Sequence, residues 1–217
     1  MTSNKDTLID LFAAVGALVF PAVASQVAVG VNITKILSKI QEERKEISQS
    51  VVLAELRHVD SYEKLAQDPK GFVAKAARFH QAALVGSAYK NLRLLARMML
   101  GYKLQAGLVA DDFLSFAGLV ESLRHDELIV LHAFIVAEQE RINDGPNKHI
   151  DLIVKVFNSL EGDMPRAEIS AIASGLTRTG FVLLEGGLDG GVWKVTPILW
   201  RLEKSYQFSE ILKEEST

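Results

Sequence analysis

The chain contains no cysteine among its 217 residues. This absence excludes disulfide bonds and thiolate metal centres, and it favours a reducing compartment. The formal net charge of −3 excludes the overall cationic excess of a polyanion-binding protein. The sequence also lacks GxGxxG, P-loop, HExxH and GxSxG motifs. We therefore assign no catalytic, cofactor-binding or metal-binding residue, and we predict a non-enzymatic protein without a cofactor.

Charged side chains are missing from residues 11–34. The run is long enough to cross a bilayer core, which needs about 20 apolar residues, and the basic residues that follow it would keep the remaining chain cytoplasmic. A second interpretation is two short apolar helices, broken at Pro21, that are buried in a core or in a self-association interface. A third is a signal peptide, against which Asp6 and Asp10 argue. All three interpretations stay open for the apolar segment 8–34.

Two long helices are expected after this segment. Apolar steps of three and four residues predict an amphipathic helix from about residue 33 to residue 67, with Arg44 as the one charged interruption. The residues of this stripe are Ile33, Leu37, Ile40, Ile47, Val51 and Ala54. The second helix is predicted over residues 71–103, after a turn at Asp68–Gly71.

Basic side chains dominate the second predicted helix, because residues 70–103 contain seven Lys or Arg and no acidic residue. Five of them share one side of a helix at 100° per residue: Lys75, Arg78, Lys90, Arg93 and Arg97. If exposed, this face would bind a polyanion or an anionic membrane surface. The alternative, which we favour, is an antiparallel hairpin in which the face pairs with Glu55, Asp60 and Glu63.

The carboxy-terminal region reads as helix, strand, glycine-rich turn, strand and helix between Pro165 and Ser205. Pro165 suits the first turn of a helix, while Thr196 and Pro197 suit an N-cap and the position after it. This order resembles the second half of a winged-helix module. Its candidate recognition helix, residues 167–176, has no Lys, Arg, Asn or Gln. Nucleic-acid binding through this module is therefore disfavoured.

Two further stretches, NLRLLARMML at 91–100 and FAGLVESLRHDELIVLHAFI at 116–135, carry a second resemblance. Over residues 85–200 the chain is similar to bacterial and prophage proteins of the abortive-infection alpha type. The resemblance rests on apolar spacing and transfers no functional residue. It implies a bacterial or phage origin and a role in phage–host conflict.

The predicted architecture is mainly α, a long-helix bundle with a small winged-helix-like α+β module. The predicted domains are a helical body over 1–143 and the module over 146–217. We predict a cytoplasmic interaction or oligomerisation protein, with a homo-oligomer as the leading partner, other proteins as further partners, and association with the inner membrane as an option. The rival functions are a membrane-inserting effector acting through residues 8–34 and a nucleic-acid-binding regulator.

Overall fold

The computed structural model describes residues 4–20, 31–60, 67–103, 105–144, 151–187 and 190–213. These residues are mainly helical and contain two small antiparallel sheets, which confirms the predicted class. The chain divides into two compact units, Met1–Ser122 and Leu123–Thr217. Each unit is described by itself below.

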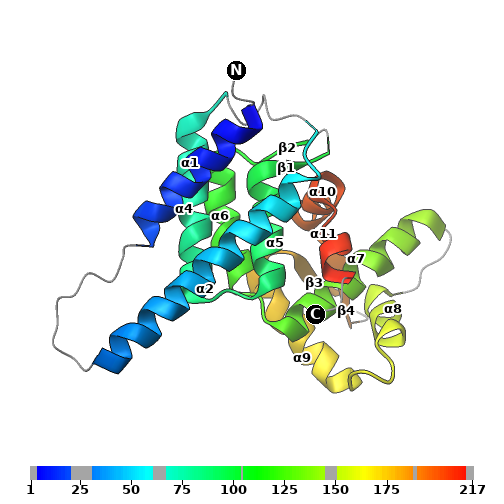
Figure 1. The fold of residues 1–217 in the computed structure, drawn as a ribbon. Coiled ribbons are helices and arrows are strands. Elements are labelled where there is room, and N and C mark those ends of the chain that lie inside the picture. The colour runs from blue at the N-terminus through cyan, green and yellow to red at the C-terminus, as the bar shows by residue number, and fades with distance from the viewer. Residues whose placement is uncertain are drawn as a thin grey trace. The chain divides into compact units, whose positions relative to one another are not determined.

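The first unit contains helices α1 (Asn4–Val19), α2 (Val31–Leu56), α4 (Pro69–Val85), α5 (Tyr89–Leu100) and α6 (Ala110–Glu121) (Figure 1). A two-stranded sheet of β1 (Gly101–Tyr102) and β2 (Gln105–Ala106) follows α5. Helix α5 is buried along its whole length from Asn91 to Leu100, because α2, α4 and α6 all pack against it. The core of this unit therefore surrounds α5.

The single helix predicted over residues 71–103 is wrong, because the structure has two helices there. Helix α4 ends at Gly86, which adopts the left-handed conformation with a φ of 89°. The Gly86 amide bonds back to the carbonyls of Ala82 and Ala83, a common way to close a helix. Similarly, α2 ends at Leu56 instead of continuing to residue 67. The apolar period continues across Gly86, so the pattern alone conceals this break.

The uncharged amino-terminal run is divided between two helices. Helix α1 ends at Val19 and α2 begins at Val31, while Pro21 lies outside the described residues. Helix α1 buries Leu8, Phe12 and Val15 on the face that packs against α4. Across the described parts of the chain, none of the helices combines the length and the apolar character needed to span a bilayer.

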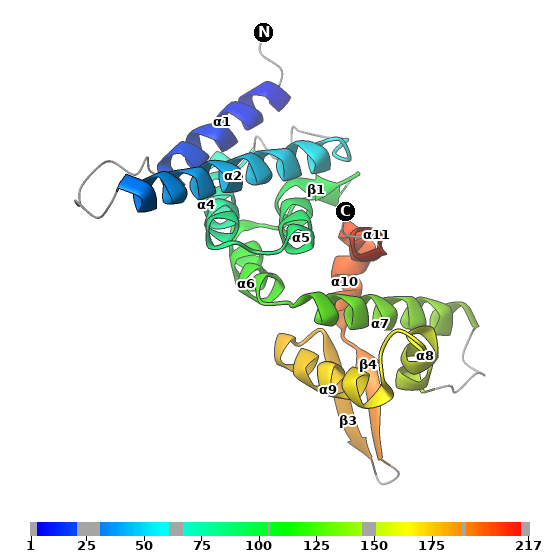
Figure 2. The ribbon, with the colours of Figure 1, turned by 60° about the horizontal axis from the view of Figure 1, so that its bottom comes forward.

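The second unit contains α7 (His125–Asp144), α8 (Leu152–Ser159), α9 (Arg166–Leu176), the 3₁₀ turn η1 (Thr177–Thr179), β3 (Val182–Gly187), β4 (Gly190–Val195), α10 (Pro197–Tyr206) and α11 (Phe208–Lys213) (Figure 2). The predicted order of helix, strand, strand and helix is present. The Thr196 hydroxyl caps α10 by accepting the Leu199 amide at 3.3 Å, and Pro197 follows as predicted. Pro165 occupies the N-cap position, one residue before the start of α9 at Arg166, and makes no side-chain capping hydrogen bond.

Helix α7 belongs with the carboxy-terminal elements. Leu131, Phe134 and Ile135 are buried on it, and it packs against α8, α9 and α11. The predicted division between residues 143 and 146 follows α7, whereas the structure divides between Ser122 and Leu123, before α7 begins. Much of α7 is apolar around its circumference, which suits a helix that is surrounded within its own unit.

Candidate interaction surface

Two of the five predicted basic residues form ion pairs with one buried carboxylate. Nε of Arg93 is 2.7 Å from Oε1 of Glu55, and Nε of Arg97 is 2.8 Å from Oε2 of the same side chain. The Glu55 side chain is 0 % exposed and that of Arg97 is 2 % exposed. The proposed pairing of this helix with Glu55 is therefore present. The Asp60 amide donates to the Lys103 carbonyl at 3.3 Å, and Glu63 lies outside the described residues.

Tyr102 extends this ionic cluster from α5 into the strand that follows. The Arg97 guanidinium lies 4.4 Å from the centre of the Tyr102 ring, and the Lys103 ammonium lies 4.7 Å from it. Cations over an aromatic face are attracted by its negative potential. The cluster thus fastens the end of α2 to α5 and to β1, which is a structural role.

The other basic residues occupy separate environments. Nζ of Lys75 donates to the carbonyls of Met99 and Leu108 at 3.3 and 2.8 Å, and burial lowers the pKa of Lys75. Nη2 of Arg78 is 2.6 Å from Oε2 of Glu121 on α6. Lys90 is partly exposed at the start of α5. Because Lys75, Arg93 and Arg97 are buried, the five cations do not share one solvent-exposed face.

The predicted apolar stripe of α2 passes from the core to an exposed part of the helix. Of its members, Val51 is 0 % exposed, while Ile47 and Ala54 are half-buried. Toward the start of the helix, Leu37 and Ile40 of the stripe are 48 % and 43 % exposed, and the neighbouring Ile36 is 59 % exposed. We call these three residues the α2 patch. In both ribbon views the first turns of α2 extend beyond α4 within the first unit, which agrees with the exposure of the patch (Figures 1 and 2).

Arg44 lies between the buried and the exposed parts of the stripe. Its guanidinium is beside Gly86, because a Cβ added to Gly86 would lie 2.9 Å from Nη2 of Arg44. A cation is favourable at the carboxyl end of a helix, because the helix dipole places partial negative charge there. The charged interruption of the stripe is therefore a contact with α4, and the α2 patch begins where this contact ends.

Two buried polar clusters could suggest catalysis. The Ser48 Oγ atom is 2.8 Å from Nδ1 of His80, which is the hydrogen bond of a nucleophile and its base. However, Ser48 and His80 are 0 % and 1 % exposed, so no substrate reaches the hydroxyl. Among the residues that the structure describes, no three His, Cys, Asp or Glu side chains converge as metal ligands.

The second cluster lines a polar pocket of about 460 Å³ in the second unit. The Glu203 carboxylate in this pocket accepts a hydrogen bond from the side-chain amide of Gln139 at 3.1 Å and another from the backbone amide of Ser209 at 2.8 Å. The Ser209 hydroxyl donates to it as well, at 2.5 Å. These bonds join α10 to α7 and α11, so the carboxylate acts as a structural connector and is poorly placed to act as a base.

The α2 patch thus gathers three exposed apolar side chains on one part of the described surface, a feature that is common at interaction sites. Sequence reasoning identified the stripe but not where its packing stops. Comparison with known proteins adds no family assignment: no family model, curated protein or solved structure matches this chain.

Proposed function

We propose that the protein is a non-enzymatic interaction protein that self-associates through the α2 patch. The observation that carries the proposal is the continuation of one apolar stripe from the core onto an exposed part of the same helix. Burying three large aliphatic side chains in an interface would contribute about 1.5–3 kcal/mol each when they are fully covered. This free energy is large enough to stabilise the association with a partner surface.

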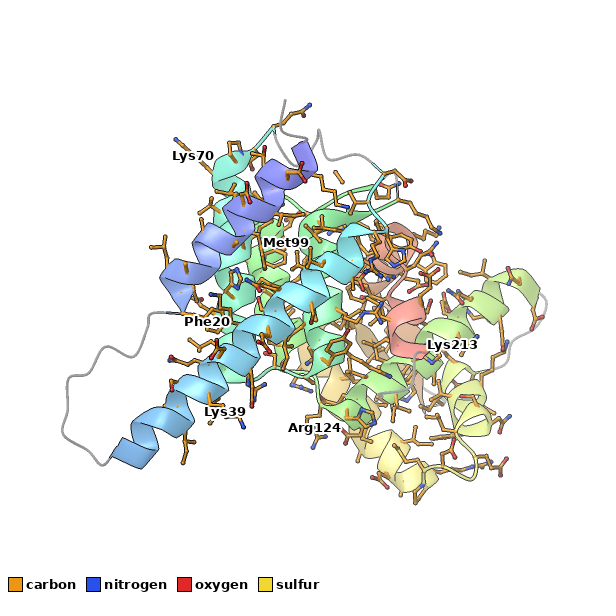
Figure 3. The ribbon with its side chains drawn as sticks, viewed as in Figure 1. Phe20, Lys39, Lys70, Met99, Arg124 and Lys213 are labelled. Carbon is orange, nitrogen blue, oxygen red and sulfur yellow. The ribbon has the colours of Figure 1, made fainter. Side chains whose placement is uncertain are left out.

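A second copy of the chain is the partner that the charges around the patch favour. Residues 39–46 contain three basic and three acidic side chains, so this surface selects neither an anionic membrane nor a nucleic acid. Lys39 and Glu43 form an exposed pair at 3.8 Å on one flank of α2, and Figure 3 shows Lys39 on the part of the helix that extends beyond α4. If the α2 helices of two copies cross antiparallel near Ile40, the same flank of each helix faces the other. Lys39 of each copy then lies near Glu43 of the other copy.

The proposal also includes the carboxy-terminal module. We keep the winged-helix-like interpretation of α9, β3, β4 and α10, with protein contact rather than DNA contact as its use. Its hairpin pairs Lys194 with Glu185 at 2.5 Å, so the hairpin's cation already has an acidic neighbour. A bacterial or phage origin and a role in phage defence rest on the resemblance to abortive-infection proteins alone.

Replacing one patch residue tests the proposal. Ile40→Glu places a carboxylate at the centre of the interface in both copies and removes the apolar contact. We expect the dissociation constant of the dimer to rise at least about 100-fold, which corresponds to about 1.5 kcal/mol lost by each copy. Sedimentation velocity over a concentration series measures this change.

The matched control is Leu114→Glu on α6, because Leu114 is 42 % exposed and Ile40 is 43 % exposed. The control should sediment like the wild type. Equal sedimentation of all three proteins would overturn the proposal. A monomeric wild type that co-sediments with anionic vesicles through Ile40 would favour the membrane-associated alternative instead.

A further inference from the structure

His80 occupies the centre of the contact between α1 and the rest of the first unit. The ring is 1 % exposed and lies 4.1 Å from the Phe12 ring, centre to centre, with Phe20 edge-on at 5.7 Å. Gly16 approaches so closely that a Cβ there would lie 2.8 Å from Cε1 of His80. Phe20 closes the site at the end of α1 (Figure 3). Residues at and near the end of α1 thus pack closely around the His80 ring.

Both ring nitrogens have partners that suit a neutral imidazole. Nε2 lies 3.1 Å from the Phe12 carbonyl, which only accepts, so Nε2 carries the proton. Nδ1 lies 2.8 Å from the Ser48 hydroxyl and accepts from it. Protonation of Nδ1 would place two donors face to face unless the hydroxyl rotated, and would leave a positive charge on a ring that is buried away from water.

The charges on the packed helices do not compensate a positive ring. Within the described residues, no carboxylate hydrogen-bonds to His80, and Lys45 of α2 opposes its protonation. On α1, Asp6 and Asp10 are exposed and lie on the side opposite Phe12 by helical geometry. On α4, Lys75 and Arg78 are held by other partners, the Met99 and Leu108 carbonyls and the Glu121 carboxylate. An isolated buried charge is strongly unfavourable.

We propose that His80 is a pH-sensitive latch, and that its protonation releases α1 from α2 and α4 and exposes the Phe12 face of α1. The device is independent of the α2 patch, because it acts on a different helix. Released α1 would present apolar side chains on several sides, since Leu18 is already 82 % exposed when the helix is docked. Mild acidification would thereby create a second, conditional interaction surface.

The sign of the pH dependence follows from the environment of the ring. Burial lowers the pKa of His80 below its ordinary value of 6.5, so the released state takes up a proton more readily than the docked state. The docking of α1 is therefore at full strength above about pH 6.5 and weakens as the pH falls toward the lowered pKa. One linked proton changes the docking equilibrium by up to about tenfold per pH unit in this window.

Hydrogen exchange of the full-length protein between pH 7.5 and pH 5.5 tests the latch. After correction for the intrinsic exchange rate, the protection of α1 amides should fall up to about tenfold per pH unit below pH 6.5, while α5 amides keep theirs. His80→Gln cannot titrate in this range, so its α1 protection should change by less than about twofold. Lys45→Glu removes a charge that opposes protonation, so the pKa of docked His80 should lie closer to its ordinary value. The loss of protection should then begin near the same pH as in the wild type but level off sooner, leaving a smaller total loss at pH 5.5.

Two results would overturn the latch. One is wild-type α1 protection that does not change between pH 7.5 and pH 5.5. The other is a loss of α1 protection that is equally steep in His80→Gln, since another group would then be responsible. If His80→Gln releases α1 already at pH 7.5, Lys45→Glu decides: a loss of α1 protection between pH 7.5 and pH 5.5 as large as that of the wild type also contradicts the proposal.

Discussion

Glu55→Ala is expected to destabilise the protein by about 3–5 kcal/mol, the cost of removing one partner from a buried ion pair. The change leaves two guanidinium groups without their carboxylate, and the side chains of Arg93 and Arg97 are only 10 % and 2 % exposed. Neither group can reach water without disturbing α5, which is buried from Asn91 to Leu100. Urea unfolding followed by far-ultraviolet circular dichroism measures the loss.

The control for this change is Glu43→Ala, which removes an exposed partner of Lys39 on the same helix. Exposed ion pairs contribute between about 0 and about 1 kcal/mol, so this variant should unfold close to the wild type. If Glu55→Ala unfolded together with Glu43→Ala, the ionic cluster would not hold α2 on α5.

Glu127→Ala is expected to cost about 2–3 kcal/mol, the value of a strong charged hydrogen bond. Arg178 donates to Glu127 through Nη1 and Nη2 at 2.5 and 2.9 Å, and the Arg124 backbone amide donates to the same carboxylate at 2.9 Å. The effect is smaller than at Glu55, because Arg178 is 45 % exposed and can be hydrated when its partner is lost. Both tryptophans, Trp193 and Trp200, lie in this unit, so tryptophan fluorescence reports its unfolding.

This pair also gives the second unit a dependence on pH. Hydrogen bonding from Arg178 lowers the pKa of Glu127, so its contribution is fully present above the unfolded pKa of about 4.5 and is lost as the pH falls through the lowered value. Glu127→Ala should therefore unfold with a weaker pH dependence below pH 4.5 than the wild type. Glu185→Ala, which removes an exposed carboxylate, is the control. A pH dependence that Glu127→Ala left intact would contradict this assignment.

Local sequence signals predicted the carboxy-terminal elements well. Thr196 and Pro197 mark the start of α10 through hydrogen bonding and a fixed backbone angle, which depend only on neighbouring residues. Gly86 carried a similar signal for the end of α4, but the apolar period on both sides of it favoured one long helix. The break is a matter of backbone conformation, and hydrophobic spacing does not report it.

Long-range features were harder to predict, since they depend on where helices end in space. Opposite charges suggested the pairing of Arg93 and Arg97 with Glu55, but not that Lys75 and Arg78 would find other partners. The stripe of α2 was visible, whereas the exposure of Ile36, Leu37 and Ile40 depends on where α4 and α5 stop. A lone histidine such as His80 carries no pattern at all, because its partners come from α1 and α2.

The most direct test of self-association through the α2 patch is a single-cysteine cross-link. Because the natural chain has no cysteine, any disulfide in Ile40→Cys must join two copies. Such a bond needs Cα atoms within about 7 Å of each other. Under mild oxidation at micromolar protein concentration, Ile40→Cys should form a species of twice the 23.8 kDa chain mass, while Leu114→Cys stays at the single-chain mass. Equal cross-linking of the two variants, or none in Ile40→Cys, would contradict self-association through this patch.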